Sequence, residues 1–241
     1  MSRMLASVSN VNEAKIVFSA GADIIDIKDP AKGALGAVEY DMATAIVNHI
    51  AGRCSISATI GDLPMHAKNI DKAISAMIVT GVDIVKVGIF SKSMAEDVLA
   101  VISEQSNKGS DIVLVFFADN NPEIIDYQRL AEAGVFGVMI DTANKKNGSL
   151  RSIMSDEKLK LFVDQAQSAG LLAGLAGSLG IDDVKLLLRL KPDYLGFRGA
   201  LCQRKQREDT IDALAVHRIR AMIPKSSDYQ LKNDMQLMSL N

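Results

Sequence analysis

The chain has 241 residues, of which 48% are hydrophobic and 23% are charged, and its formal net charge is −2. These fractions are typical of a globular protein and exclude a disordered, collagen-like or disulfide-stapled chain. A chain so close to neutrality has no overall basic field to hold a polyanion, so we expect no nucleic-acid partner. A local cluster of cations can still bind a small anion.

The 2 cysteines and 3 histidines are scattered along the chain. They include no Cys-x-x-Cys and no spacing of a zinc site, so we expect neither a metal nor another cofactor. The segment from Met1 to Ser9 lacks the apolar run of a signal peptide, and no stretch approaches the ~18 apolar residues that span a bilayer. We therefore expect a cytoplasmic protein that does not contact membranes.

Short β-branched runs alternate with longer amphipathic runs, with no break in composition. The expected strands are Met4–Val8, Ala22–Lys28, Ser55–Ile60, Asp83–Ile89, Asp111–Ala118, Val135–Asp141, Leu171–Ala176 and Asp193–Arg198. The expected helices are Asn12–Ala20, Met42–Ala51, Met65–Val79, Met94–Ser106, Pro122–Ala133, Asp156–Ala169, Ile181–Leu190 and Asp209–Met222. Proline at a helix start and glycine just after a helix end support these boundaries.

This alternation predicts a single-domain α/β fold, the (β/α)8 TIM barrel, whose usual size is about 250 residues. The strands are near-continuous apolar runs, as in parallel sheets that are covered on both faces. A doubly wound open sheet is the competing architecture. We expect residues 1–223 to form the barrel and the polar residues 224–241 to form a C-terminal tail or an oligomer contact. We also expect the protein to be a homo-oligomer.

Four segments resemble one another and favour the barrel: AGADIIDIK at 20–28, TGVDIVKVG at 80–88, AGVFGVMID at 133–141 and KPDYLGFRG at 191–199. They contain the second, fourth, sixth and eighth expected strands, so the repeated module is a pair of strand–helix units. Repetition of this kind suits a closed barrel better than an open sheet. The first half of each segment is also a common helix-to-strand junction and carries less weight.

The second half of each segment places charge inside an apolar strand. Because strand side chains alternate between faces, Asp26 and Lys28 share one face of the second strand, and isoleucines occupy the other. Aligning the segments adds Lys86, Asp141 and Arg198 to the same inward face. Buried charges cost several kcal/mol unless they are paired, and active sites of this fold lie at the carboxyl ends of the strands. We therefore interpret these residues as an active site, with a structural ion-pair network as the alternative.

Two lysines in one secluded cavity suggest Schiff-base chemistry. Desolvation and a neighbouring cation both lower the pKa of a lysine amine, and a neutral amine can attack a carbonyl. The resulting iminium acidifies the adjacent C–H bond, which permits aldol addition and elimination without a metal. Asp26 and Asp141 are placed to carry protons.

Residues for a phosphate site occur in the last third of the chain. Gly177 and Ser178 follow the seventh strand, and Arg198 and Gly199 follow the eighth. These two loops of the barrel often bind phosphate through backbone N–H groups, and an arginine can add a bidentate contact. Lys145, in the polar loop after the sixth strand, can reach a second phosphate or a carbonyl. The expected partner is therefore a small phosphorylated sugar.

Several blocks resemble the (5-formylfuran-3-yl)methyl phosphate synthase family, also called 4-(hydroxymethyl)-2-furancarboxaldehyde-phosphate synthase. The most specific block is DIIDIKDP at residues 23–30, followed by GALGA at 33–37. The blocks VDIVKVG at 82–88, GVMIDTA at 137–143 and GLAGSL at 174–179 are similar to others in the family. The resemblance spans roughly Met4 to Arg220.

This resemblance implies a metal-free lyase on a (β/α)8 barrel. Such an enzyme condenses two glyceraldehyde-3-phosphates into a furan aldehyde phosphate, with release of phosphate and water, for the biosynthesis of methanofuran-type cofactors. The resemblance implies that Lys28 is the Schiff-base lysine, that Lys86 is the proton acceptor, and that Asp26, Asp141 and Lys145 assist. The chain departs from the family at residues 118–122, where the loop lacks a basic residue that would help to hold the second substrate.

Two other functions remain open at this point. One is another lysine-dependent class I aldolase, or a sugar-phosphate isomerase, because both need a phosphate site and acid–base groups on the same barrel. The other is a barrel that binds a phosphorylated metabolite without turning it over.

Overall fold

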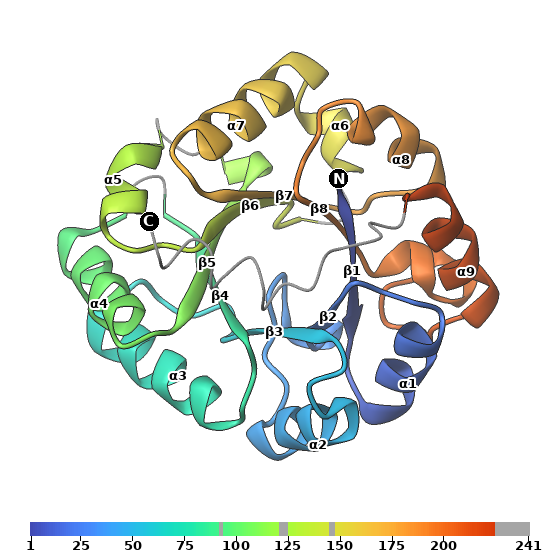
Figure 1. Cartoon of the computed structure of the whole chain (residues 1–241), viewed down its shortest axis with the longest axis horizontal. Helices are drawn as coiled ribbons and strands as arrows, with labels where there is room; N and C mark the ends of the chain where they lie inside the picture. The colour runs from blue at the N-terminus through green and yellow to red at the C-terminus, as the bar shows by residue number, and fades with distance from the viewer. Residues whose placement is uncertain (92–93, 121–124, 145–147, 225–241) are drawn as a thin grey trace.

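The structure is a computed structural model that describes residues 1–91, 94–120, 125–144 and 148–224. Its strands are all parallel and close in chain order, from β1 to β8, into one barrel (Figure 1). The prediction of a single-domain (β/α)8 barrel is confirmed, and the open sheet is excluded because β8 pairs with β1. Lys145 and residues 225–241 of the predicted tail lie outside the described residues.

The strands are β1 (Arg3–Val8), β2 (Ile24–Ile27), β3 (Ser55–Thr59), β4 (Ile84–Ile89), β5 (Asp111–Phe117), β6 (Gly137–Asp141), β7 (Leu172–Leu175) and β8 (Tyr194–Phe197). The helices are α1 (Val11–Ser19), α2 (Tyr40–Ile50), α3 (Ala67–Val79), α4 (Glu96–Asn107), α5 (Tyr127–Glu132), α6 (Leu150–Ile153), α7 (Asp156–Ser168), α8 (Ile181–Leu188) and α9 (Ala213–Met222). Short 3-10 turns lie at η1 (Pro30–Lys32), η2 (Ala118–Asn120), η4 (Gly199–Leu201) and η5 (Gln203–Lys205).

Most helix boundaries differ from the prediction by one or two residues, and larger differences occur at three places. The expected start of the fifth helix, Pro122, falls in residues 121–124, which lie outside the described residues, and α5 begins at Tyr127 with Asp126 as its N-cap. The last helix begins at Ala213 rather than Asp209, because Asp212 caps it by accepting the N–H of Leu214. The turn α6 was not predicted, since its four residues are too few to show a helical period.

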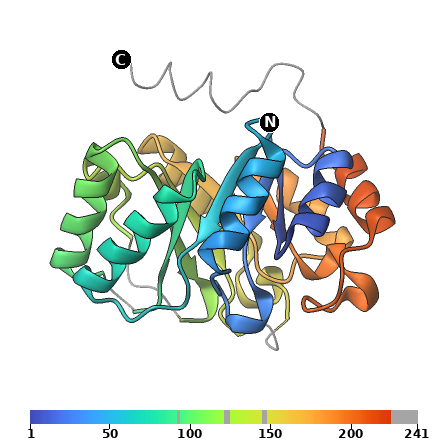
Figure 2. The same ribbon diagram turned by 90° about the horizontal axis from the view of Figure 1, so that it is seen from below.

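Alternating side chains give the barrel two apolar regions. Outward-facing residues of the strands pack against the surrounding helices. Figure 2 shows this ring of helices around the barrel edge-on. Inward-facing residues form a separate cluster in the lumen, toward the amino ends of the strands. This cluster includes Leu5, Ile24, Ile84, Val113 and Tyr194. The polar side chains near the carboxyl ends of the strands lie beyond this cluster and border a cavity.

The first half of the repeated segments has a structural role, because an aspartate in it holds the start of the preceding strand. In three of them an aspartate accepts the N–H of a residue at the start of the preceding strand: Asp23 from Met4 at 2.7 Å, Asp83 from Ile56 at 2.9 Å and Asp193 from Ala173 at 2.7 Å. The third segment has Phe136 at this place and cannot form such a bond. The similarity of these first halves therefore reflects a common helix-to-strand junction and not a functional motif.

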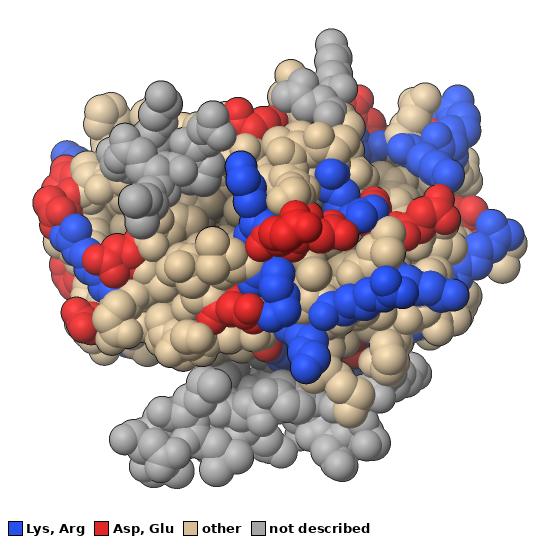
Figure 3. Space-filling view, turned by 90° about the horizontal axis from the view of Figure 1, so that it is seen from above, with Lys and Arg blue, Asp and Glu red and all other residues tan. Residues whose placement is uncertain are grey.

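The face seen in Figure 3 carries Lys and Arg side chains interspersed with Asp and Glu, without a large patch of one sign. Among the described residues, no helix is both long and apolar enough to cross a membrane.

The half-buried carboxyl of Asp111, at the start of β5, leads to a pH-dependent prediction. Burial, and then the charge of Asp83, raise the pKa of Asp111 to about 6. Folding therefore favours the protonated carboxyl, so this group stabilises the fold at acid pH and loses that effect as the pH rises through about 6. We expect Asp111→Asn to raise the melting temperature relative to wild type at pH 7.5, with a smaller difference at pH 4. A difference that is the same at both pH values would contradict this.

Candidate active site

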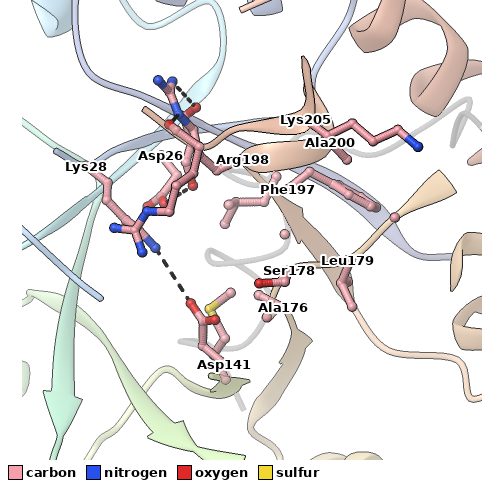
Figure 4. Close-up of a pocket in the computed structure, with 18 of the residues that line it drawn as sticks. Asp26, Lys28, Asp141, Ala176, Ser178, Leu179, Phe197, Arg198, Ala200 and Lys205 are labelled. Carbon is pink, nitrogen blue, oxygen red and sulfur yellow. Dashed lines mark hydrogen bonds and ion pairs between the residues drawn. The ribbon is translucent and has the colours of Figure 1, made fainter. Parts of the chain in front are cut away.

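Four charged side chains from three strands border one cavity at the carboxyl end of the barrel. Asp26 and Lys28 come from the end of β2, Lys86 from β4 and Asp141 from β6, and all line a cavity of about 300 Å³. Each is at most 6% exposed. The alternation of strand side chains thus brings together the residues that it predicted, and Figure 4 shows Lys28 and Asp141 facing each other across the cavity.

Asp26 is the most completely enclosed of these groups. Its Oδ1 lies 2.6 Å from Lys86 Nζ and accepts a hydrogen bond of 2.7 Å from Ser57 Oγ. Its Oδ2 accepts a bond of 2.7 Å from Ser7 Oγ. One ammonium group and two hydroxyl groups therefore compensate the cost of burying this carboxylate.

Sequence reasoning missed Ser7 and Ser57, although a signal was present. Both lie directly opposite Asp26 in the register, one on β1 and the other on β3. Both are also polar residues on the inward face of their strands. Reading the odd strands for inward polar residues, as was done for the even strands, would have found them.

Lys28 forms the second ion pair of the cavity. Its Nζ lies 3.6 Å from Asp141 Oδ2, and the two side chains are 8% and 4% exposed. Both lysines thus open into one space that is shielded from solvent. Paired charges would also be expected of a purely structural network, but these border an open cavity instead of filling the lumen, which the apolar cluster below them already fills. The arrangement therefore favours an active site.

The opposite end of the same cavity is lined by the loops after β7 and β8, including Gly177, Ser178 and Gly199. The backbone N–H groups of these residues have no acceptor in the part of the chain that the structure describes. Gly177 has a φ of +110°, and a Cβ there would lie 2.8 Å from a methyl group of Thr142, so only glycine fits. Free N–H groups on a tightly turned backbone can bind an anion.

Arg198 also lines the cavity, but its guanidinium does not point to a free phosphate site. It forms a bidentate ion pair with Glu13 of α1 at 2.6 and 3.1 Å. Its other N–H groups donate to the carbonyls of Ser7, Arg207 and Asp209. All five donors of the guanidinium are thus used within the protein. The predicted bidentate phosphate contact would require breaking this network, so the geometry assigns Arg198 to bracing of the loops instead.

The loop after β6 is anchored by the segment after β5, which is the segment that lacks the basic residue expected from the family. Asp119 of η2 accepts the N–H groups of Ala143 at 2.8 Å and Asn144 at 2.7 Å. Asp119 therefore fixes the start of the loop that carries Lys145, and Lys145 itself lies outside the described residues.

The loop after β2 is held over the barrel mouth. Asp62 accepts the N–H groups of Ala34 at 2.7 Å and Leu35 at 2.6 Å. Leu35 is fully buried and joins the apolar cluster of the lumen. Gly33 has a φ of +123°, and a Cβ there would overlap the Asp62 carboxylate, so this turn requires glycine. The loop thus packs Leu35 into the barrel shortly after Lys28.

Within the described residues, no three His, Cys, Asp or Glu side chains are grouped so that they could hold a metal ion.

Comparison with known proteins identifies the family. The family model described as 4-HFC-P synthase matches residues 4–220. The chain belongs to the 4-HFC-P synthase family. A protein of Methylorubrum extorquens provisionally named (5-formylfuran-3-yl)methyl phosphate synthase is 41% identical over 224 residues, which cover 91% of this chain and 92% of that protein. The enzyme of that name from Methanopyrus kandleri is 33% identical over 236 residues, covering 91% and 97%.

Solved structures agree with the fold. The 3-hexulose-6-phosphate synthase structure superposes with a TM-score of 0.63 at 16% identity and covers 92% of this chain and 100% of its own. Phosphoribosyl anthranilate isomerase from Thermus thermophilus gives a TM-score of 0.61 at 12% identity, covering 91% and 97%. At such low identity these similarities establish the barrel and nothing further. Because the chain belongs to this family and its relatives are named as such enzymes, it is an enzyme of the (5-formylfuran-3-yl)methyl phosphate synthase kind.

The ion pair of Glu13 and Arg198 should be a major contributor to stability. Glu13→Gln would leave a buried guanidinium without its counter-charge, and we expect it to lower the free energy of unfolding by about 3 kcal/mol, measured by urea denaturation. The control is Asp156→Asn, which breaks the more exposed bidentate pair with Arg151 and should cost about 1 kcal/mol or less. An equal loss of unfolding free energy in the two variants would contradict a major contribution of the Glu13–Arg198 pair to stability.

Proposed function

We propose that this protein condenses two molecules of glyceraldehyde-3-phosphate to (5-formylfuran-3-yl)methyl phosphate through a Schiff base on Lys28, without a metal or another cofactor. One observation carries the proposal: two buried lysines, each paired with a buried aspartate, share one cavity in a chain of this family. The product would supply the furan ring of methanofuran-type cofactors.

The first step needs an uncharged amine. Lys28 Nζ passes a proton to the Asp141 carboxylate, 3.6 Å away, and attacks the aldehyde carbon of the first substrate. The new C–N bond replaces the C=O bond, and the carbonyl oxygen leaves as water after Asp141 returns its proton. The covalent iminium then serves as the electron sink for the following steps.

Carbon–carbon bond formation follows from proton removal. The iminium acidifies the C–H bond beside it. Lys86 passes its ammonium proton to the Asp26 carboxylate, whose Oδ1 lies 2.6 Å from Nζ, and the freed amine accepts the C–H proton. The resulting enamine attacks the aldehyde carbon of the second substrate, whose oxygen takes up a proton. Elimination of inorganic phosphate and water and closure of the ring give the aromatic furan, and hydrolysis of the imine frees Lys28.

The far end of the cavity suits the phosphate of the bound substrate. Gly177, Ser178 and Gly199, whose N–H groups have no acceptor among the described residues, line the same cavity as the lysines. A small phosphorylated aldehyde can therefore place its phosphate there and its carbonyl toward Lys28. Binding by backbone groups also agrees with the engagement of Arg198 by Glu13.

Covalent trapping tests the role of Lys28. Reduction with borohydride in the presence of glyceraldehyde-3-phosphate should add the mass of one reduced substrate to the peptide that contains Lys28. Lys28→Arg should abolish the adduct and lower turnover by at least about 1000-fold, because a guanidinium stays protonated and cannot form an imine. The matched control is Lys32→Arg, an exposed lysine on the same loop that pairs with Glu39 and should keep wild-type activity. Normal turnover by Lys28→Arg would refute the covalent mechanism.

Product analysis separates the furan synthase from its alternatives. With glyceraldehyde-3-phosphate as sole substrate, we expect a product that absorbs in the near ultraviolet and an accompanying release of inorganic phosphate. Reversible formation of a ketose phosphate without phosphate release would indicate an aldolase or isomerase. Binding without turnover, unaffected by Lys28→Ala, would indicate a non-catalytic barrel.

A further inference from the structure

Two cations that line the cavity, Arg207 and Lys205, have no counter-charge among the described residues. Arg207 lines the same cavity as Lys28 and is half-buried. Lys28, Lys86 and Arg198 each pair with a carboxylate. Arg207 has no carboxylate within ion-pair distance in the described ranges of the chain. A half-buried guanidinium without an anion marks a place where a bound anion would be favourable.

The position of this guanidinium is set by the loop that follows Lys28. Nη2 of Arg207 donates to the carbonyl oxygens of Pro30 and Gly33. The N–H groups on Nε and Nη1 have no acceptor among the described residues. The loop therefore orients the guanidinium through one nitrogen and leaves the other two available to a ligand.

Other cations at the mouth are less suitable for this role. Arg198 has used all its donors. Lys205 borders the cavity from the side of Ala200, and its side chain extends away from Lys28 (Figure 4). Lys32, although on the loop itself, is exposed and pairs with Glu39.

We propose that Arg207 binds the phosphate of the second substrate molecule, on the Lys28 side of the cavity. This inference rests on the proposed function, which requires two phosphorylated aldehydes in one site. The first phosphate is assigned to the loops at Gly177 and Gly199, and the loop after β5 supplies no basic residue in its described part. Arg207 provides the missing positive charge, and its contact with the Lys28 loop places the second aldehyde beside the covalent adduct of the first.

Turnover and trapping distinguish phosphate binding from a merely structural contact. Arg207→Gln removes the charge but keeps an amide donor for the loop carbonyls, and it should raise KM for glyceraldehyde-3-phosphate by about 10- to 100-fold. Arg207→Lys, which keeps the charge, should recover part of this loss. Borohydride trapping of unphosphorylated glyceraldehyde at Lys28 should match wild type in both variants. The control, Arg204→Gln, lies on the same loop, pairs with Asp209 and should leave KM unchanged.

Two results would overturn the inference. One is a KM of Arg207→Gln equal to that of Arg204→Gln. The other is an equal loss of trapping with the unphosphorylated aldehyde, which would mean that Arg207 only braces the Lys28 loop. Calorimetric titration with inorganic phosphate adds a measurement that needs no imine: wild type should bind at two sites and Arg207→Gln at one, and equal numbers would also refute the assignment. Failure of wild type to form any Lys28 adduct would refute the proposed function alone.

Discussion

Burial of charge inside an apolar barrel is the constraint on which this structure depends. The carboxylate of Asp26 is fully enclosed. It is tolerated because Ser7 and Ser57 donate to it from the adjacent strands β1 and β3, and Lys86 of β4 pairs with it. A barrel makes such an arrangement possible, since register partners on adjacent parallel strands point to the same face of the sheet. The cost of desolvation is thus offset by contacts that also hold a reactive amine in a fixed place.

Two arginines link the loops around the mouth into one frame. Arg198 joins β1 and α1 to the loop after β8 through Glu13 and backbone carbonyls. Arg207, on that same loop, reaches across to the segment that follows Lys28. The end of the cavity with the free N–H groups and the end with the lysines are therefore connected through a short run of residues.

Much of the architecture could be predicted because it follows from local patterns. Alternating β-branched and amphipathic runs predicted the strands and helices, and the inward face of β2, β4 and β6 was correct to the residue. Helix starts were less accurate, because a single capping residue such as Asp212 decides them and similar residues lie nearby. The short turn α6 carries too little periodicity to be recognised.

By itself, the sequence determined the closed barrel and the set of charged residues that face its cavity. Both depend on the period of two in a strand and on short-range patterning, which are visible along the chain. Only the tertiary structure decided which partner each charge takes. Arg198 meets Glu13 across 185 residues of sequence, and Arg207 meets Pro30 across 177. Barrel closure creates these contacts, and no local pattern encodes them. For this reason the sequence did not reveal that Arg198 is engaged by Glu13, or that Arg207 lines the cavity.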